Sequence, residues 1–185
     1  MNYDPKKHHR SSIRLQGYDY RQAGFYYVTI CCYQRQCLFG EIVNGVMQPN
    51  LMGETVVAVW NRLTQHFPFI ELDAFVLMPN HVHGIIVIQE RQINLGVEES
   101  QVNNASLPRG TQSGSLGAII QNFKSVSKRR INRFAQNKLT IWQRGYHEEI
   151  IRNEKAYENI RKYILENPLK WEEDAENPVK TSKTK

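Results

Sequence analysis

The amino-acid sequence predicts an α+β domain with a ferredoxin-like (RRM-like) antiparallel sheet, β-α-β-β-α-β, followed by an extra C-terminal helix. Two observations carry this prediction. Strand-like apolar segments alternate with segments whose apolar residues recur at helical spacing. In addition, the apolar run over residues 74–88 is interrupted by Pro79-Asn80, so it divides into two consecutive strands. Two adjacent strands between two helices are the centre of the split β-α-β-β-α-β motif.

Each predicted element has a local signal. In order, the elements are a strand over 25–34, a short hairpin over 38–48, a helix over 50–66, strands over 70–78 and 81–88, a helix over 115–136, an extended segment over 141–151 and a helix over 154–166. The first strand is rich in aromatic and β-branched residues, and Asn44-Gly45 is a strong hairpin turn. Asn153 is a suitable N-cap for the last helix. Pro168 ends that helix, because the residue before a proline avoids helical backbone angles.

Composition indicates one globular domain in a chain of 185 residues, of which 41% are hydrophobic and 23% charged. We expect a cytoplasmic protein, because the sequence contains neither a secretion signal nor an apolar run long enough to span a membrane. Residues 1–23 form a basic arm, 24–168 a single domain with a mobile connection over 90–114, and 169–185 a charged tail. The tail is expected to fray, with Trp171 anchoring its first turn. Three cysteines without CxxC spacing are expected to be reduced thiols.

Positive charge is concentrated in two places on a chain of net charge +6. Such clusters predict contacts with the phosphates of a polyanion such as DNA, which position a strand without reading its sequence. A solvated tail and a solvated helix face are the alternative interpretations. The clusters contain Arg10, Arg14 and Arg21 in the arm, and Lys124, Lys128, Arg129 and Arg130 in the second predicted helix.

His81 and His83 lie one residue apart in a strand that is otherwise apolar. Side chains alternate along a strand, so both imidazoles project from the same face. Two imidazoles side by side on a rigid strand form half of a metal site. The alternative is a pair of ordinary sheet histidines that are hydrogen-bonded and inert.

The last predicted helix adds two polar groups on one face. That face carries Ala156, Ile160, Tyr163 and Asn167. If it docks near the histidine strand, the Asn167 oxygen and the two imidazoles would suit Mg²⁺ or Mn²⁺. A tyrosine hydroxyl in line with a polarised phosphate can attack it and form a phosphotyrosine. Spacing alone favours an aromatic core residue as the interpretation of Tyr163, and Asn167 fits an ordinary residue at a helix end.

The order of these motifs resembles a known family. The segments MPNHVHGIIVI, FKSxxxxxIN and YHEEIIRNEKAYENIRKYILENPLKW are similar to the IS200-like single-tyrosine transposases with a His-hydrophobic-His (HUH) site. The similarity is greatest to the branch associated with repeated extragenic palindromes (REP), and it covers roughly residues 20–171. It implies that His81, His83 and Asn167 bind the catalytic divalent metal and that Tyr163 is the nucleophile.

The resemblance also implies a function. It implies a metal-dependent endonuclease and strand transferase that cuts single-stranded DNA at the foot of a hairpin, leaving a 5′-phosphotyrosine and a free 3′-hydroxyl for DNA transposition and recombination. The implied partners are DNA hairpins such as REP sequences, with the protein a monomer or a homodimer. His147 matches a family pattern and is expected near the site or on the surface. Arg152 is expected to contact DNA or to pair with Glu148 or Glu149.

Two other functions stay open. A non-catalytic single-stranded nucleic-acid-binding protein with an RRM-like sheet would need exposed aromatic residues, for which Tyr26 and Tyr33 are the candidates. A metal-dependent hydrolase of a small phosphate ester would turn over without a covalent tyrosine adduct. A zinc-protease motif is excluded, because Ile151 stands where HExxH requires its second histidine.

Overall fold

A four-stranded antiparallel sheet lies at the centre of the computed structural model, which describes residues 15, 17–90, 111–136 and 138–178. Its strand order is β4-β5-β1-β6. The strands are β1 (Gly24–Cys31), β4 (Ile70–Leu77), β5 (His81–Ile88) and β6 (His147–Ile151). The predicted ferredoxin-like sheet is therefore confirmed. Most of the arm (1–14 and 16) and most of the connection predicted over 90–114 (91–110) lie outside the described residues.

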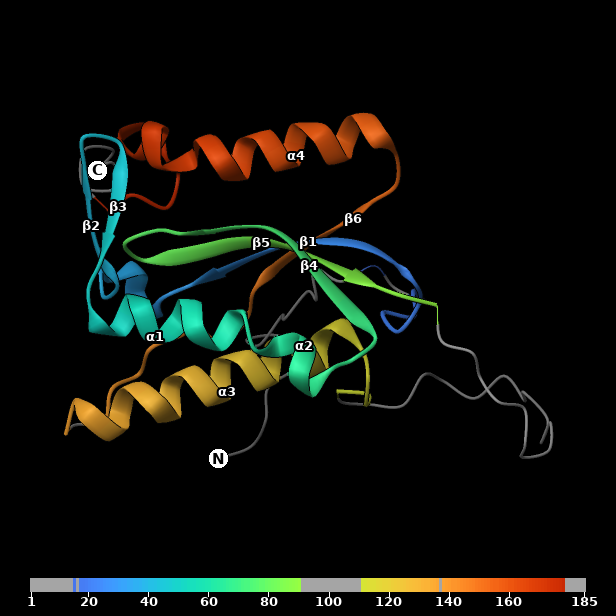
Figure 1. The fold of residues 1–185 in the computed structure, drawn as a ribbon, viewed down its shortest axis with the longest axis horizontal. Coiled ribbons are helices and arrows are strands. Elements are labelled where there is room, and N and C mark those ends of the chain that lie inside the picture. The colour runs from blue at the N-terminus through green and yellow to red at the C-terminus, as the bar shows by residue number, and fades with distance from the viewer. Residues whose placement is uncertain (1–14, 16, 91–110, 137, 179–185) are drawn as a thin grey trace, which may run out of the picture.

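Helices cover both faces of the sheet (Figure 1). Helices α1 (Leu51–Trp60) and α3 (Leu116–Phe134) lie on one face, and α4 (Glu154–Glu166) lies on the other. The predicted N-cap of α4 is confirmed, because the Asn153 side chain accepts a hydrogen bond from the Ala156 backbone N–H at 2.9 Å. None of the described helices is long and apolar enough to cross a membrane.

Three predicted elements are shorter in the structure than the sequence suggests. The strand expected over 25–34 ends at Cys31, and residues 33–35 form a short 3₁₀ helix instead. The helix expected over 50–66 breaks after Trp60, and a short helix, α2 (Leu63–His66), follows. The extended segment expected over 141–151 forms a single bridge at its start, between Trp142 and Cys32, and becomes a strand only at its end, as β6. Before β6, the Lys124 ammonium donates to the carbonyl oxygens of residues 143, 144 and 145 at 2.5, 3.1 and 3.1 Å. These hydrogen bonds tie residues 143–145 to α3 between the bridge and β6.

The predicted hairpin forms a separate two-stranded sheet of β2 (Gly40–Val43) and β3 (Val46–Pro49). Asn44 and Gly45 have φ angles of 51° and 75°. Positive φ at both central residues is the geometry of a type I′ turn, whose twist matches that of the flanking strands. A short 3₁₀ helix, η1 (Tyr33–Arg35), precedes the hairpin.

Two apolar cores lie on the two faces of the sheet. Under α1 and α3, Tyr26, Val28 and Ile86 pack with Trp60 and Phe123. The smaller core under α4 contains Tyr27, Ala74, Ile85, Ile151 and Ile164. Alternation along β1 thus sends Tyr26 and Tyr27 to opposite faces.

The expectation that the tail frays after Leu169 is wrong for the described residues. A 3₁₀ helix, η2 (Asn167–Glu173), continues from α4, and Asp174 and Asn177 are buried. Glu176 fixes the segment, because its carboxylate pairs with the Arg35 guanidinium at 2.9 Å and its carbonyl accepts from Asn80 Nδ2 at 2.7 Å. Residues 179–185 lie outside the described part.

Candidate metal and tyrosine site

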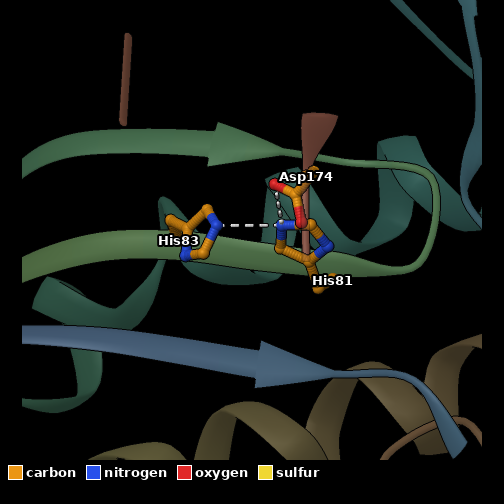
Figure 2. Close-up of side chains that lie close together, drawn as sticks. All are labelled: His81, His83 and Asp174. Carbon is orange, nitrogen blue, oxygen red and sulfur yellow. Dashed lines mark hydrogen bonds and ion pairs between the residues drawn. The ribbon is translucent and has the colours of Figure 1, made fainter. Parts of the chain in front are cut away.

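The two histidines of β5 lie side by side, next to Asp174 (Figure 2). They project from the sheet face that α4 covers, because the Tyr163 hydroxyl of α4 lies 3.5 Å from His83 Nε2. Their Nε2 atoms lie 2.9 Å apart, and the residues are 0% and 2% exposed. Hydrogen bonds through Nδ1 orient both rings. His81 Nδ1 contacts Asn80 Oδ1 at 2.7 Å, and His83 Nδ1 contacts the hydroxyls of Tyr27 and Thr29 at 2.7 and 2.8 Å. Hydrogen bonds to the second ring nitrogen hold a metal-binding imidazole in position.

The surroundings of His81 leave its Nε2 lone pair available. Asn80 donates both of its amide hydrogens, to the carbonyls of Arg35 and Glu176, so its Oδ1 faces His81. His81 Nδ1 must therefore carry the proton. Burial also lowers the pKa of His81 and of His83 to about 3, so both rings are neutral near pH 7. Neutral imidazole is the form that binds metal.

Two buried oxygen atoms near the histidines lack hydrogen-bond partners. Asp174 Oδ2 lies 3.9 Å from His81 Nε2, and Asn167 Oδ1 is also unpaired. Ligand atoms of His81, His83 and Asp174 lie within 4.8 Å of one another. A buried carboxylate oxygen without a partner is costly, so this arrangement fits a bound cation. His81, His83 and Asp174 can therefore hold a metal ion.

Asp174 is the site residue that the sequence did not reveal. It follows a 3₁₀ helix without apolar periodicity, in a segment whose charge suggested exposure to solvent. The one available signal was Trp171, which packs beside the His81 ring with centroids 6.1 Å apart. That contact brings η2 under the end of α4 and turns Asp174 inward.

Tyr163 reaches the same place from α4. Its hydroxyl lies 3.5 Å from His83 Nε2, while the residue is 45% exposed. Partial burial raises the pKa of Tyr163, and the charge of Asp174 adds to this, whereas a hydrogen bond with the Asn167 side chain opposes it. The phenol is therefore protonated at neutral pH and stands between solvent and the histidine pair.

The structure places the predicted DNA-binding residues in different regions. Arg10 and Arg14 lie outside the described residues, and Arg21 forms a bidentate ion pair with Asp19. Arg152 is exposed next to the start of α4, and the His147 ring is 6.3 Å from that of Tyr27, at the edge of the site.

The basic residues of α3 lie on the opposite face of the sheet from the histidine pair (Figure 1). Beside α3 is a hollow of about 630 Å³, lined among others by Gln121, Lys128 and Arg144. Lys124 also lines it, but its ammonium is held by three carbonyls, and burial lowers its pKa to about 8. Arg129 and Arg130 continue the basic surface along the helix.

Tyr26, one of the two aromatic residues suggested for base stacking on an RRM-like sheet, cannot serve that role. It is 0% exposed and packs beneath α1 and α3. Tyr33 is 44% exposed but lies in η1, outside the sheet. The α4 face of the sheet, where an RRM-like protein would bind, instead carries the histidine pair.

Comparison with known proteins agrees with the fold and the resemblance. No protein-family model matches the chain. An uncharacterised protein of Haemophilus influenzae is 44% identical over 177 residues, covering 93% of this chain and 95% of that protein. A second protein of that organism, named "Putative REP-associated tyrosine transposase", is 23% identical over 82% of this chain and 74% of its own length. A solved REP-associated tyrosine transposase bound to a REP hairpin matches with a TM-score of 0.57 and 19% identity, covering 87% of this chain and 74% of that one.

Proposed function

We propose that this chain nicks and transfers single-stranded DNA in a metal-dependent reaction. The chain belongs to one family with the uncharacterised Haemophilus influenzae protein, and it has the fold of the REP-associated tyrosine transposases. The observation that carries the proposal is the position of Tyr163, whose hydroxyl lies 3.5 Å from His83 Nε2 while the residue is 45% exposed. A phenol held beside a metal-binding group and open to solvent can reach a phosphodiester.

The proposed metal ligands are His81, His83, Asp174 and Asn167. Two imidazole nitrogens and two side-chain oxygens form a mixed donor set that suits Mn²⁺ or Mg²⁺. When bound, such an ion supplies positive charge that polarises the phosphate and favours the phenolate form of Tyr163. Asn80, Tyr27 and Thr29 keep the two rings fixed through their Nδ1 atoms.

The proposed step is a transesterification at phosphorus. The Tyr163 oxygen attacks a phosphodiester and loses its proton, and the bond from phosphorus to the 3′-oxygen breaks. The 3′-oxygen takes up a proton and leaves as a free hydroxyl, while the 5′-phosphate stays on Tyr163 as a phosphotyrosine. The phosphoester bond is conserved, so a later 3′-hydroxyl can reverse the reaction and join a new strand.

We further propose DNA hairpins as the substrate, because the solved relative is bound to a REP hairpin. The hollow beside α3 offers Lys128 and Arg144 to a sugar-phosphate backbone. His147 and Arg152 lie on the α4 side of the sheet, where a single strand would approach Tyr163. Arg10, Arg14 and Arg21 of the arm, with Arg129 and Arg130, complete the proposed DNA-binding set.

The test is to incubate the protein with Mn²⁺ and a pool of single-stranded hairpins, and to sequence the DNA that becomes covalently attached. We expect an adduct with the wild type and none with Tyr163→Phe, although that variant still binds the selected hairpins. Tyr33→Phe is the control, since Tyr33 is 44% exposed and lies in η1, outside the sheet that carries the histidines. An adduct that persists in Tyr163→Phe would contradict the assigned nucleophile. Turnover of a small phosphate ester without any adduct would instead support a hydrolase.

A further inference from the structure

Helix α4 packs mainly on the β4 and β5 half of the sheet. On the other half, Tyr27 of β1 and Ile151 of β6 are buried in the small core beneath α4, whereas Phe25 of β1 is 42% exposed. The Tyr27 ring contacts the rings of both His83 and Tyr163, with centroids 5.6 and 6.5 Å apart. Tyr27 therefore lies between the tyrosine site and Phe25 along β1.

A hollow of about 200 Å³ lies beside Phe25. It is lined by Phe25, Ile151, Arg152, Asn153, Glu154 and Tyr157. Tyr157 forms a fixed wall, because its ring meets Phe25 at a centroid distance of 5.5 Å and its hydroxyl donates to Asp73 at 2.5 Å. The hollow is thus aromatic and apolar on its inner side.

Charge at the rim of the hollow is mixed. The exposed Arg152 guanidinium has no carboxylate within 4.0 Å among the residues that the structure describes, so the predicted pairing with Glu148 or Glu149 does not form there. Glu154, in the first turn of α4, also lines the hollow. An anionic group is therefore favoured next to Arg152, while the aromatic inner side suits a flat, neutral group.

The distance from the tyrosine site fits a neighbouring nucleotide. Phe25 and Tyr27 project from the same face of β1, two residues or roughly 7 Å apart. The Tyr27 and Tyr163 rings add a further 6.5 Å between their centroids. The hollow therefore lies within about two nucleotides of a phosphate at the Tyr163 hydroxyl. Aromatic side chains bind unpaired bases by stacking, with little dependence on sequence.

Building on the function proposed above, we propose that this hollow is a subsite for an unpaired base that flanks the cleaved phosphate. The base stacks on Phe25 against the wall formed by Tyr157, and Arg152 binds its phosphate. The subsite would hold the strand in line with Tyr163 without requiring a base pair. In this arrangement the single-stranded flank binds at the hollow, and the backbone of the hairpin stem binds at the basic surface beside α3.

The test measures binding of a ten-nucleotide, hairpin-free DNA of random sequence by fluorescence anisotropy. We expect Phe25→Leu to weaken binding about tenfold, the usual loss for one stacked base. Phe25→Trp should retain affinity, and the added tryptophan fluorescence should be quenched on binding, relative to the wild type. Phe134→Leu is the matched control, because Phe134 is 39% exposed and lies at the end of α3 on the other side of the sheet. Arg152→Gln should reduce the salt dependence of binding by about one charge.

Running the adduct assay in parallel separates the two proposals. If the wild type forms the adduct, but Phe25→Leu binds like the wild type and the added fluorescence of Phe25→Trp is unchanged by DNA, the subsite is wrong and the nicking function stands. If Phe25→Leu weakens binding but no hairpin yields an adduct, the subsite stands and the nicking function is wrong. If the wild type neither binds the DNA nor forms an adduct, both proposals fail.

Discussion

Asp174 combines burial, charge and an unpaired oxygen in one residue. Oδ1 accepts the Glu176 backbone N–H at 2.6 Å, whereas Oδ2 faces His81 without a hydrogen bond. Without a cation, such a carboxylate destabilises the fold, because desolvation of the charge is not offset by a partner. With a cation, the same oxygen becomes a ligand. The Asp174 charge therefore lowers the stability of the metal-free protein and raises its affinity for the metal.

We predict that Asp174→Asn weakens Mn²⁺ binding and stabilises the metal-free protein. Loss of the ligand charge should lower affinity by roughly ten- to a hundredfold. Removal of the uncompensated charge should raise the free energy of unfolding in EDTA by roughly 1–3 kcal/mol. Calorimetric titration with Mn²⁺ and urea unfolding measure the two effects. Glu173→Gln, an exposed neighbour, should change neither. Unchanged Mn²⁺ affinity in Asp174→Asn would exclude this carboxylate from the site.

Among the secondary-structure elements, β5 determines the position of the site. One of its faces carries the histidine pair, and the other carries Val82, Gly84 and Ile86 towards α1 and α3. A Cβ atom on Gly84 would meet Trp60 Cζ2 at 2.4 Å. The strand therefore lies unusually close to α1, and the two imidazoles are supported from behind by a large buried ring.

Gly84→Ala should lower the free energy of unfolding by roughly 1–3 kcal/mol, the usual cost of overpacking a core. It should also weaken Mn²⁺ binding, because the strand must shift away from Trp60 next to His83. Gly145→Ala is the control, since no atom lies within 4 Å of the added methyl group. Urea unfolding of the three proteins measures the effect, and equal stability of Gly84→Ala and the wild type would contradict this account.

Elements with strong local signals were predictable from the sequence, and those that depend on distant contacts were not. The bounds of α4 followed from the Asn153 cap and from Pro168, and the shared face of His81 and His83 followed from strand alternation. The residues just before β6 contact Lys124 of α3, whose ammonium donates to their carbonyl oxygens. No local pattern in residues 141–151 indicates this contact. The inward turn of Asp174 depends on Trp171 and Glu176 docking near the site, which no local pattern reveals.

At the scale of the whole molecule, one chain supplies every group of the candidate site. The sheet order brings β5 under α4, so Tyr163 meets His83 across 80 residues of sequence within the same chain. The sequence left open whether the tyrosine helix docks on its own domain or on that of a partner. In the structure, α4 packs on the sheet of its own chain.

We therefore predict that two inactive variants cannot restore each other. An equimolar mixture of Tyr163→Phe and His83→Gln should form no DNA adduct, because neither chain contains a complete site. The wild type diluted with an equal amount of Tyr163→Phe should retain the activity of its own chains. Adduct formation in the mixture of the two variants, at any protein concentration, would indicate that α4 is exchanged between subunits.

The position of α4 after the last strand has a consequence during protein synthesis. Ribosomes make the chain from its N-terminus, so the sheet residues and both histidines are translated before Tyr163 and Asp174. Any nascent or prematurely terminated chain that ends before α4 contains the imidazoles but lacks the proposed nucleophile. Under the proposed function, such a chain could not form the phosphotyrosine adduct, because its nucleophile is added only after the sheet residues are made.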